Sequence, residues 1–144
     1  MSSTTHASAV LIGPNAALIR GPAGSGKSQL AWQLLQGGLP FARLVADDRA
    51  HIEARAGRLL VRPAPSLAGL IEIRGLGIRH LPYEPVAAVG LVVDLAAADA
   101  GRLPAREAGQ TALEGVTLPR LAVAAGQSAL PLLLAFLRTL PAPN

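Results

Sequence analysis

The sequence contains no cysteine, which excludes disulfides and cysteine-bound metals and fits a reducing compartment. Aromatic residues make up only 3% of the chain, so alanine, leucine, valine and isoleucine must build the core. Long hydrophobic runs are also missing, because Asp94 and Pro131 interrupt the two best candidates, and a membrane span needs about 20 residues. No basic residue precedes the apolar stretch that starts at Ala7, so no secretion signal is expected. We therefore expect a soluble, cytoplasmic protein without a membrane partner.

Lysine is almost absent, since Lys27 is the only one and the remaining basic residues are arginines spread from Arg20 to Arg138. The formal charge of +4 would suit nucleic acid, but the sequence has no basic cluster and few rings to stack on bases. We therefore expect no nucleic-acid binding and favour an anionic small molecule or an acidic protein partner. A solitary lysine in an arginine-rich chain indicates a position that requires a compact ammonium group.

The length of 144 residues predicts one domain spanning residues 1–144. Half of the residues are hydrophobic (51%) and few are charged (15%), which suits a buried sheet flanked by helices. We expect an α/β fold with a mixed sheet. Strands are predicted at residues 7–12, 16–19, 43–46, 51–53, 58–62, 71–73 and 86–95, and helices at 27–36 and 127–140.

A glycine-rich segment between a predicted strand and a predicted helix matches the pattern G-x-x-x-x-G-K-[ST], and we call residues 21–28 the phosphate loop. In such a loop, glycines let backbone N–H groups surround phosphate oxygens, the lysine bridges the terminal phosphates and the last hydroxyl ligates Mg²⁺. The alternative is a glycine-rich turn without a ligand, which the flanking strand and helix disfavour. The residues are Gly21, Pro22, Ala23, Gly24, Ser25, Gly26, Lys27 and Ser28.

Two adjacent carboxylates, Asp47 and Asp48, follow the apolar run at residues 44–46. Open α/β sheets bind ligands at the carboxyl ends of their strands, where Mg²⁺-ATP chemistry needs an acid to orient a water or accept a hydroxyl proton. Alone, the pair would suggest an ordinary turn or cap. The phosphate loop twenty residues upstream favours the catalytic interpretation.

A second acidic segment places Glu72 and Arg74 two residues apart, directly before the glycine-rich turn at residues 75–77. Strand alternation would send both side chains to the same face. From the pattern alone, an exposed salt bridge beside a turn is as good an interpretation as a catalytic role.

These three segments together resemble the catalytic domain of the HPr kinase/phosphorylase family, which phosphorylates a serine of the phosphocarrier HPr. The run from Glu72 to Ile78 resembles the signature stretch of the family and is more specific than the phosphate loop. The resemblance extends over about residues 6–120 and implies a short form that consists of the carboxyl-terminal catalytic domain. It also implies the fold shared with phosphoenolpyruvate carboxykinase, ATP and Mg²⁺ as cofactors, an HPr-type carrier as substrate, and a hexamer.

The resemblance also implies roles for individual residues. One acid, which we expect to be Asp48, would take the proton of the incoming serine, and in reverse would return it while phosphate removes the phosphoryl group as pyrophosphate. The glycine that precedes the family arginine is missing before Arg120, so kinase activity is better supported than phosphorylase activity. The candidates for catalysis are Lys27, Asp47, Asp48, Arg74, His6 and Arg120, and those for Mg²⁺ are Ser28 and Glu72.

Two other functions remain open at this point. A small-molecule kinase or another NTPase would share the phosphate loop but would not need the segment from Glu72 to Ile78. A non-catalytic module that senses ATP would bind nucleotide without consuming it.

Overall fold

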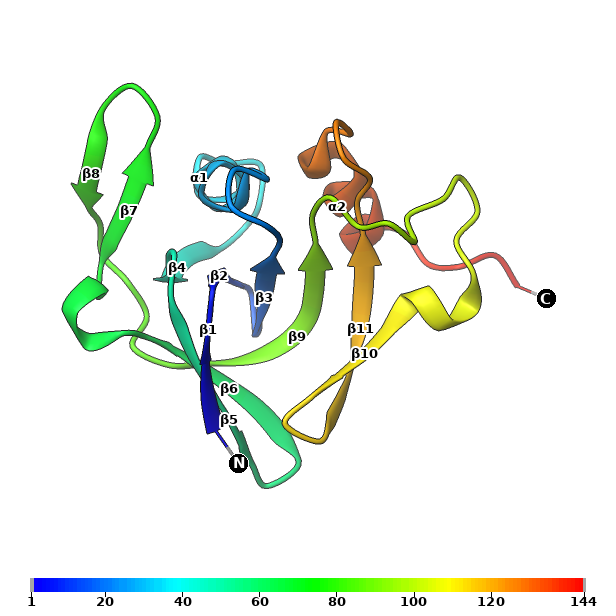
Figure 1. The fold of residues 1–144 in the computed structure, drawn as a ribbon, viewed down its shortest axis with the longest axis horizontal. Helices are drawn as coiled ribbons and strands as arrows, with labels where there is room; N and C mark the ends of the chain where they lie inside the picture. The colour runs from blue at the N-terminus through cyan, green and yellow to red at the C-terminus, as the bar shows by residue number, and fades with distance from the viewer. Residues whose placement is uncertain (1, 144) are drawn as a thin grey trace.

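A computed structural model describes residues 2–143, and it contains a nine-stranded mixed sheet, a separate two-stranded hairpin and two α-helices (Figure 1). The expected mixed α/β fold is therefore confirmed. In the sheet, the strand order is β1-β5-β6-β9-β3-β2-β4. Off this path, β11 pairs with the carboxyl-terminal end of β9, whereas β6 pairs with its amino-terminal end, and β10 pairs with β11. The strands of this sheet are β1 (Ser2–Thr5), β2 (Ala7–Ile12), β3 (Asn15–Arg20), β4 (Ala42–Ala46), β5 (Ala50–Arg55), β6 (Arg58–Pro63), β9 (Ala87–Asp94), β10 (Gln110–Leu113) and β11 (Val116–Ala122).

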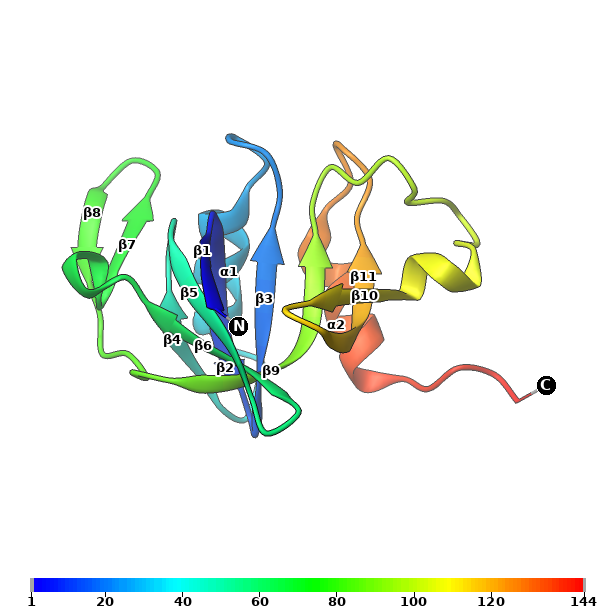
Figure 2. The same ribbon diagram turned by 60° about the horizontal axis from the view of Figure 1, so that its bottom comes forward.

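The centre of the sheet consists of three parallel strands, because β9 pairs in parallel with both β3 and β11. In both views of the ribbon their arrowheads point the same way, so the loops that follow them gather at one edge (Figures 1 and 2). The remaining pairs in this sheet are antiparallel. The edge formed by the carboxyl ends of β3, β9 and β11 is where sheets of this kind bind ligands.

The two helices, α1 (Lys27–Leu35) and α2 (Ala129–Arg138), pack with one face of the sheet into a single apolar cluster. Helix α1 contributes Leu30, Ala31 and Leu34, which share one side because they are spaced by about one turn. Pro131 is tolerated in α2 because it lies in the first turn, where backbone N–H groups have no intrahelical partner.

The opposite face of the sheet is covered by strands rather than helices. A second apolar cluster joins Leu18 and Val92 of the central strands with Ile52 of β5 and Val61 of β6. Alternation along β3 explains both clusters, since Leu18 points to this face and Ile19 points to the helices. The antiparallel β5–β6 hairpin lies below the central strands in the first view (Figure 1).

A hairpin separate from the main sheet carries the segment from Glu72 to Ile78. It consists of β7 (Leu70–Ile73) and β8 (Gly77–His80), and Ile71 anchors it to the cluster beneath α1. Two 3₁₀ turns complete the described elements, at Pro65–Leu67 and Arg106–Gly109. In residues 2–143 no helix is both long and apolar enough to cross a membrane.

Candidate functional site

The phosphate loop leaves the carboxyl end of β3 and enters the first turn of α1, as the sequence predicts. Ser25 donates its N–H to the Pro22 carbonyl at 3.1 Å, and Leu30 donates to the Gly26 carbonyl at 2.9 Å, which starts the helix. Gly24 and Gly26 have φ values of 80° and 101°. Residues other than glycine rarely adopt this left-handed region, so the backbone of the loop requires glycine at these two positions.

The ammonium group of Lys27 folds back over this loop. Its Nζ donates to the Gly21 carbonyl at 2.8 Å and to the Pro22 carbonyl at 3.2 Å. An ammonium has three donors, so a third remains for a ligand in the adjoining cleft. The lysine therefore joins the start of α1 to the start of the loop.

Asp47 is buried, with 4% of its surface exposed, and it connects three separate elements. Its carboxylate accepts hydrogen bonds from Ser8 Oγ of β2 at 2.6 Å, from Ser28 Oγ of α1 at 2.8 and 2.9 Å, and from the Glu72 N–H of β7 at 3.2 Å. A buried carboxylate needs such donors to offset its lost hydration. Asp47 thereby sets the position of the Ser28 hydroxyl.

Asp48 lies in a different environment, although it is the next residue. It is exposed, and its φ of 69° places it in the left-handed region, where aspartate is tolerated better than most residues. A hydrogen bond of 2.8 Å from the Arg49 N–H to the Asp47 carbonyl closes the tight turn around it. Backbone strain of this kind clusters at functional sites. The two acids therefore have distinct positions, one beneath the Ser28 hydroxyl and one facing solvent.

A cleft of about 1090 Å³ brings most of the predicted site residues together. It lies between the phosphate loop, the turn at Asp48, the start of β2 and the end of β7. Positive and negative side chains share it, which suits an anionic ligand handled together with a cation. The predicted residues that line it are His6, Gly21, Pro22, Ala23, Gly24, Gly26, Lys27, Ser28, Asp48, Glu72 and Arg74.

Arg120 does not line this cleft and instead belongs to an ion-pair network on β9 and β11. Its Nε donates to Asp94 at 2.6 Å, and its two terminal nitrogens donate to Asp99 at 2.8 and 3.0 Å. Arg20, at the end of β3, donates to both oxygens of Asp94 at 2.7 and 2.8 Å. In this arrangement the Arg120 guanidinium ties β11 to β9, and its predicted catalytic role remains a prediction.

The network predicts how stability depends on pH. Burial alone would raise the pKa of Asp94, but hydrogen bonds and positive charge from Arg20 and Arg120 hold it below its ordinary value. A lowered folded-state pKa means that Asp94 stabilises the fold above its unfolded pKa of about 3.9 and loses this contribution as the pH falls through the folded value. We expect Asp94→Asn to be less stable at neutral pH and to lose less stability on acidification.

Urea unfolding at about pH 6 and about pH 3 measures this difference. Asp99→Asn is the matched control, because Asp99 also pairs with Arg120 but is 52% exposed and should matter less. An Asp94→Asn protein with the same loss of stability on acidification as the unmodified protein would contradict the assignment.

The side chains around Ser28 suit Mg²⁺. The Ser28 hydroxyl and the Glu72 carboxylate are hard oxygen donors, and Asp47 orients the hydroxyl. Across residues 2–143, no group of three or more histidine, cysteine, aspartate or glutamate side chains could enclose a metal. Mg²⁺ normally has one or two carboxylate ligands and takes its other ligands from water and substrate phosphates, so this donor set fits it.

Two residues of the site were not singled out from the sequence. Ser8 lies fully buried within the apolar strand β2 and donates to Asp47. A hydroxyl in an otherwise apolar strand could have indicated this bond, because a buried donor needs an acceptor. Trp32, the only tryptophan, lines the cleft from α1 and gave no signal beyond helical periodicity.

Together these features define a mixed α/β domain with a glycine-rich loop, a lysine and paired acids at the carboxyl edge of its central strands. The family model described as "HPr Serine kinase C-terminal domain" matches residues 1–83. The chain belongs to this family. The matched part includes the phosphate loop, the acidic pair and the β7–β8 hairpin, whereas β9 to α2 lie beyond it.

Curated relatives match a part of this chain that is shorter than the family match. The HPr kinase/phosphorylase of Limosilactobacillus reuteri (strain DSM 20016) is 48% identical over 62 residues, which is 42% of this chain and 18% of that protein. The HPr kinase/phosphorylase of Clostridium tetani is 42% identical over 65 residues, or 45% of this chain and 20% of the relative. The aligned segment thus spans about a fifth of the length of these relatives.

A solved structure extends the similarity to the second half of the chain. It is the HPr(Ser) kinase/phosphatase from Coxiella burnetii, with a TM-score of 0.73 and 27% sequence identity. The match covers 94% of this chain and 93% of that one, so the arrangement of nearly the whole domain recurs.

Proposed function

We propose that this protein is an ATP-dependent kinase that transfers a phosphoryl group to a serine of an HPr-type phosphocarrier protein. Family membership supports the class of reaction. The single observation that carries the proposal is that the two adjacent acids occupy different positions. Asp47 accepts the hydrogen bond of Ser28, while Asp48 faces the cleft that Lys27 lines. A phosphate-binding group, a metal-ligand hydroxyl and a free carboxylate thereby meet in one cleft.

The phosphate loop and Lys27 would bind the β- and γ-phosphates of ATP. The loop N–H groups and the amino end of α1 supply partial positive charge, and the third donor of the Lys27 ammonium would bind a phosphate oxygen. Ser28 and Glu72 would hold Mg²⁺, which supplies charge neutralisation at the phosphates when bound. Most of the catalysis would be positioning and electrostatic stabilisation.

Asp48 would act as the general base in the transfer. The serine oxygen of the carrier attacks the γ-phosphorus, the bond from that phosphorus to the bridging oxygen breaks, and ADP leaves with the electron pair. The serine proton passes to the Asp48 carboxylate, which is exposed and therefore reachable by a protein substrate. His6 and Arg74 line the same cleft and would contact the phosphate groups or the carrier.

The reverse reaction follows from the same residues. An oxygen of inorganic phosphate would attack the phosphorus of the seryl phosphate, and the bond from that phosphorus to the serine oxygen would break. Pyrophosphate would form, and Asp48 would return the proton to the departing serine oxygen. We rank this activity below the kinase activity because Arg120, the arginine expected to take part in it, is already paired with Asp94 and Asp99.

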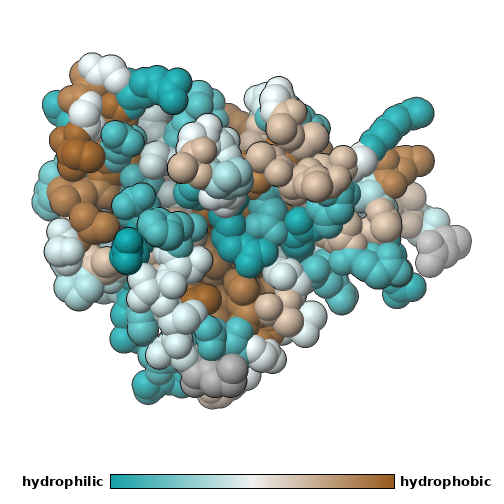
Figure 3. Space-filling model, in the orientation of Figure 1, coloured by the Kyte–Doolittle hydropathy of each residue, from teal (hydrophilic) through white to brown (hydrophobic). Residues whose placement is uncertain are grey.

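The β7–β8 hairpin would provide the contact surface for the carrier. Glu72, Ile73 and Arg74 line the cleft, and beyond them Leu76 and Ile78 are 64% and 63% exposed. Figure 3 shows hydrophobic residues gathered on the side of the molecule where this hairpin lies in Figure 1. Exposed apolar side chains next to a site suit a protein partner. The homo-oligomer that the family resemblance implies, a hexamer, would require further contacts of this kind.

The decisive experiment incubates the protein with labelled ATP, Mg²⁺ and a purified HPr-type carrier. Transfer of label to a serine of the carrier is expected, and a variant carrier with that serine replaced by alanine is the control. A parallel panel of small metabolites tests for a small-molecule kinase. Label in a metabolite, or tight ATP binding without transfer to any acceptor, would overturn the proposal in favour of the first or the second alternative.

A further inference from the structure

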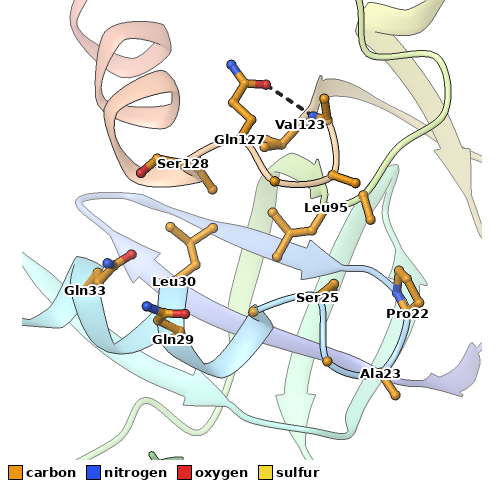
Figure 4. Close-up of a pocket in the computed structure, with 17 residues that line it drawn as sticks. Pro22, Ala23, Ser25, Gln29, Leu30, Gln33, Leu95, Val123, Gln127 and Ser128 are labelled. Carbon is orange, nitrogen blue, oxygen red and sulfur yellow. Dashed lines mark hydrogen bonds between the residues drawn. The ribbon is translucent and has the colours of Figure 1, made fainter.

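Two hollows adjoin the phosphate loop, and they differ in charge. The first is the cleft, which is lined by Lys27, Asp48, Glu72 and Arg74. The second is a cavity of about 390 Å³, enclosed by the loops that follow β3, β9 and β11 (Figure 4). None of the described residues that line this cavity is charged. A metal ion would therefore find charged partners in the cleft and not in the cavity.

On the cleft side, the pairing of β2 with β4 contains a shift of one residue. Val10 pairs with Leu44, whereas the neighbouring Ala9 pairs with Ala46, so Val45 is an extra residue on β4. A slip of one residue turns every later side chain to the opposite face of the sheet. Val45 and Ala46 accordingly both belong to the apolar cluster on the face away from the helices, whereas Leu44 belongs to the cluster on the helix face.

This shift brings Asp47 opposite Ser8. In the register that the two strands have after the shift, the next pair toward the site is Ser8 and Asp47, and opposed residues point to the same face. Ser8 shares its face with Val10, which packs with the helices, so the Asp47 carboxylate is directed toward α1. Without the extra residue, Asp47 would lie opposite Ala7, which points to the other face of the sheet.

Donors from two strands hold the two oxygens of this carboxylate. Ser8 Oγ donates to Asp47 Oδ1 at 2.6 Å, and the Glu72 N–H donates to Oδ2 at 3.2 Å. The Ser28 hydroxyl lies 2.8 Å from Oδ1 and 2.9 Å from Oδ2. A hydroxyl has one proton and two lone pairs, so a Ser28 hydroxyl whose proton points at Asp47 keeps its lone pairs for a metal. The direction of the Ser28 hydroxyl thus depends on how firmly the carboxylate is held.

Ser8 makes the shortest of these contacts from outside the cleft. It is fully buried and is not among the described residues that line the cleft. A buried hydroxyl in an apolar strand is costly unless it is paired, and here its acceptor is the carboxylate beneath Ser28. We infer that Ser8 is a positioning residue for Mg²⁺, because it fixes Asp47 and thereby keeps the lone pairs of the Ser28 hydroxyl directed at the metal. This inference rests on the proposed function.

The role of Ser8 is tested by measuring ATP affinity in excess Mg²⁺ and in EDTA, by calorimetry and by fluorescence of Trp32, which lines the cleft. The ratio of the two affinities reports how tightly the complex holds the metal, since the affinity of Mg²⁺ for free ATP is the same for every variant. We expect Ser8→Ala to lower this ratio about tenfold, as for other groups that orient a metal ligand. Its ATP affinity in EDTA should stay within about twofold, because the phosphate loop and Lys27 are unchanged.

Val10→Ala is the matched control, because Val10 is equally buried on the same face of β2 but has no polar group, and its ratio should stay within about twofold. In a Ser28→Ala background, Ser8→Ala should cause no further fall, since Ser8 acts through that hydroxyl. If Ser8→Ala does not fold, Ser8→Cys, whose S–H is a weak donor, takes its place.

Three results would each overturn the role of Ser8. They are an unchanged ratio in the folded Ser8 variant, an equal fall in Val10→Ala, and a full additional fall from Ser8→Ala in the Ser28→Ala background. If ATP binds under neither condition, or if Lys27→Ala binds ATP as tightly as the unmodified protein, the proposed function fails instead.

Discussion

Replacing Lys27 by alanine is expected to abolish phosphoryl transfer to the carrier while leaving the fold intact. The ammonium is the only lysine charge in the chain, and it lies at the surface of the cleft against the carbonyls of Gly21 and Pro22. Water can replace it at these carbonyls, of which the Pro22 contact is exposed and the Gly21 contact is part-buried, so the free energy of unfolding should change by less than about 0.5 kcal/mol. Loss of its charge at the phosphates should lower kcat by at least about 10²- to 10³-fold.

The transfer assay with labelled ATP measures this effect, and circular dichroism with urea unfolding checks the fold. Arg102→Ala, which removes one exposed positive charge far along the sequence from the phosphate loop, is the control and should keep full activity. Lys27→Arg should also be strongly impaired, because a planar guanidinium does not reproduce a compact ammonium. A folded Lys27→Ala protein with nearly normal turnover would defeat the assignment of the loop.

Replacing Asp48 by asparagine is expected to lower kcat by about 10²- to 10⁴-fold while nucleotide affinity stays the same. Asparagine is isosteric and tolerates the left-handed φ of 69° at this position, so the backbone should be preserved. The amide cannot accept the serine proton. Single-turnover transfer measures the rate, and calorimetry with ATP and Mg²⁺ measures the affinity.

Asp47→Asn provides the contrasting variant. Its carboxylate accepts hydrogen bonds from Ser8, Ser28 and Glu72, and an amide nitrogen would face one of these donors. We therefore expect a loss of about 1–3 kcal/mol of stability together with weaker binding of Mg²⁺ and ATP. If Asp48→Asn lost nucleotide affinity and Asp47→Asn lost only turnover, the roles of the two acids would be reversed.

The part of the fold that local signals control was predictable. Short apolar runs, the turn at residues 13–15 and the glycines at 37 and 38 predict the β2–β3 hairpin and helix α1, and the structure confirms them within a residue or two. The hairpin of β5 and β6 is also confirmed. These elements are specified by neighbours in the sequence, which is why periodicity and turn residues suffice.

Strands stabilised mainly by distant partners were not predicted. The polar β1 is a strand because it pairs with β5, and β11 contains Pro119, a residue that argues against a strand. β8 is short and fully exposed, and β10 is short and only partly buried, so neither strand shows a clear pattern of hydrophobic residues. For β1 and β11, pairing with strands far apart in the chain supplies what their own composition does not, whereas β8 and β10 pair with the neighbouring strands β7 and β11.

The sequence by itself determined the phosphate loop, the family signature and the presence of an acidic pair, because each is a run of neighbouring residues whose chemistry follows from type and spacing. Only the tertiary structure decided that Asp47 is buried beneath Ser28 while Asp48 faces the cleft, and that Arg120 pairs with Asp94. It also decided that loops from three strands enclose a neutral cavity. Burial, hydrogen-bond partners and cavities arise from contacts between segments distant in the chain, and spacing along one segment does not encode them.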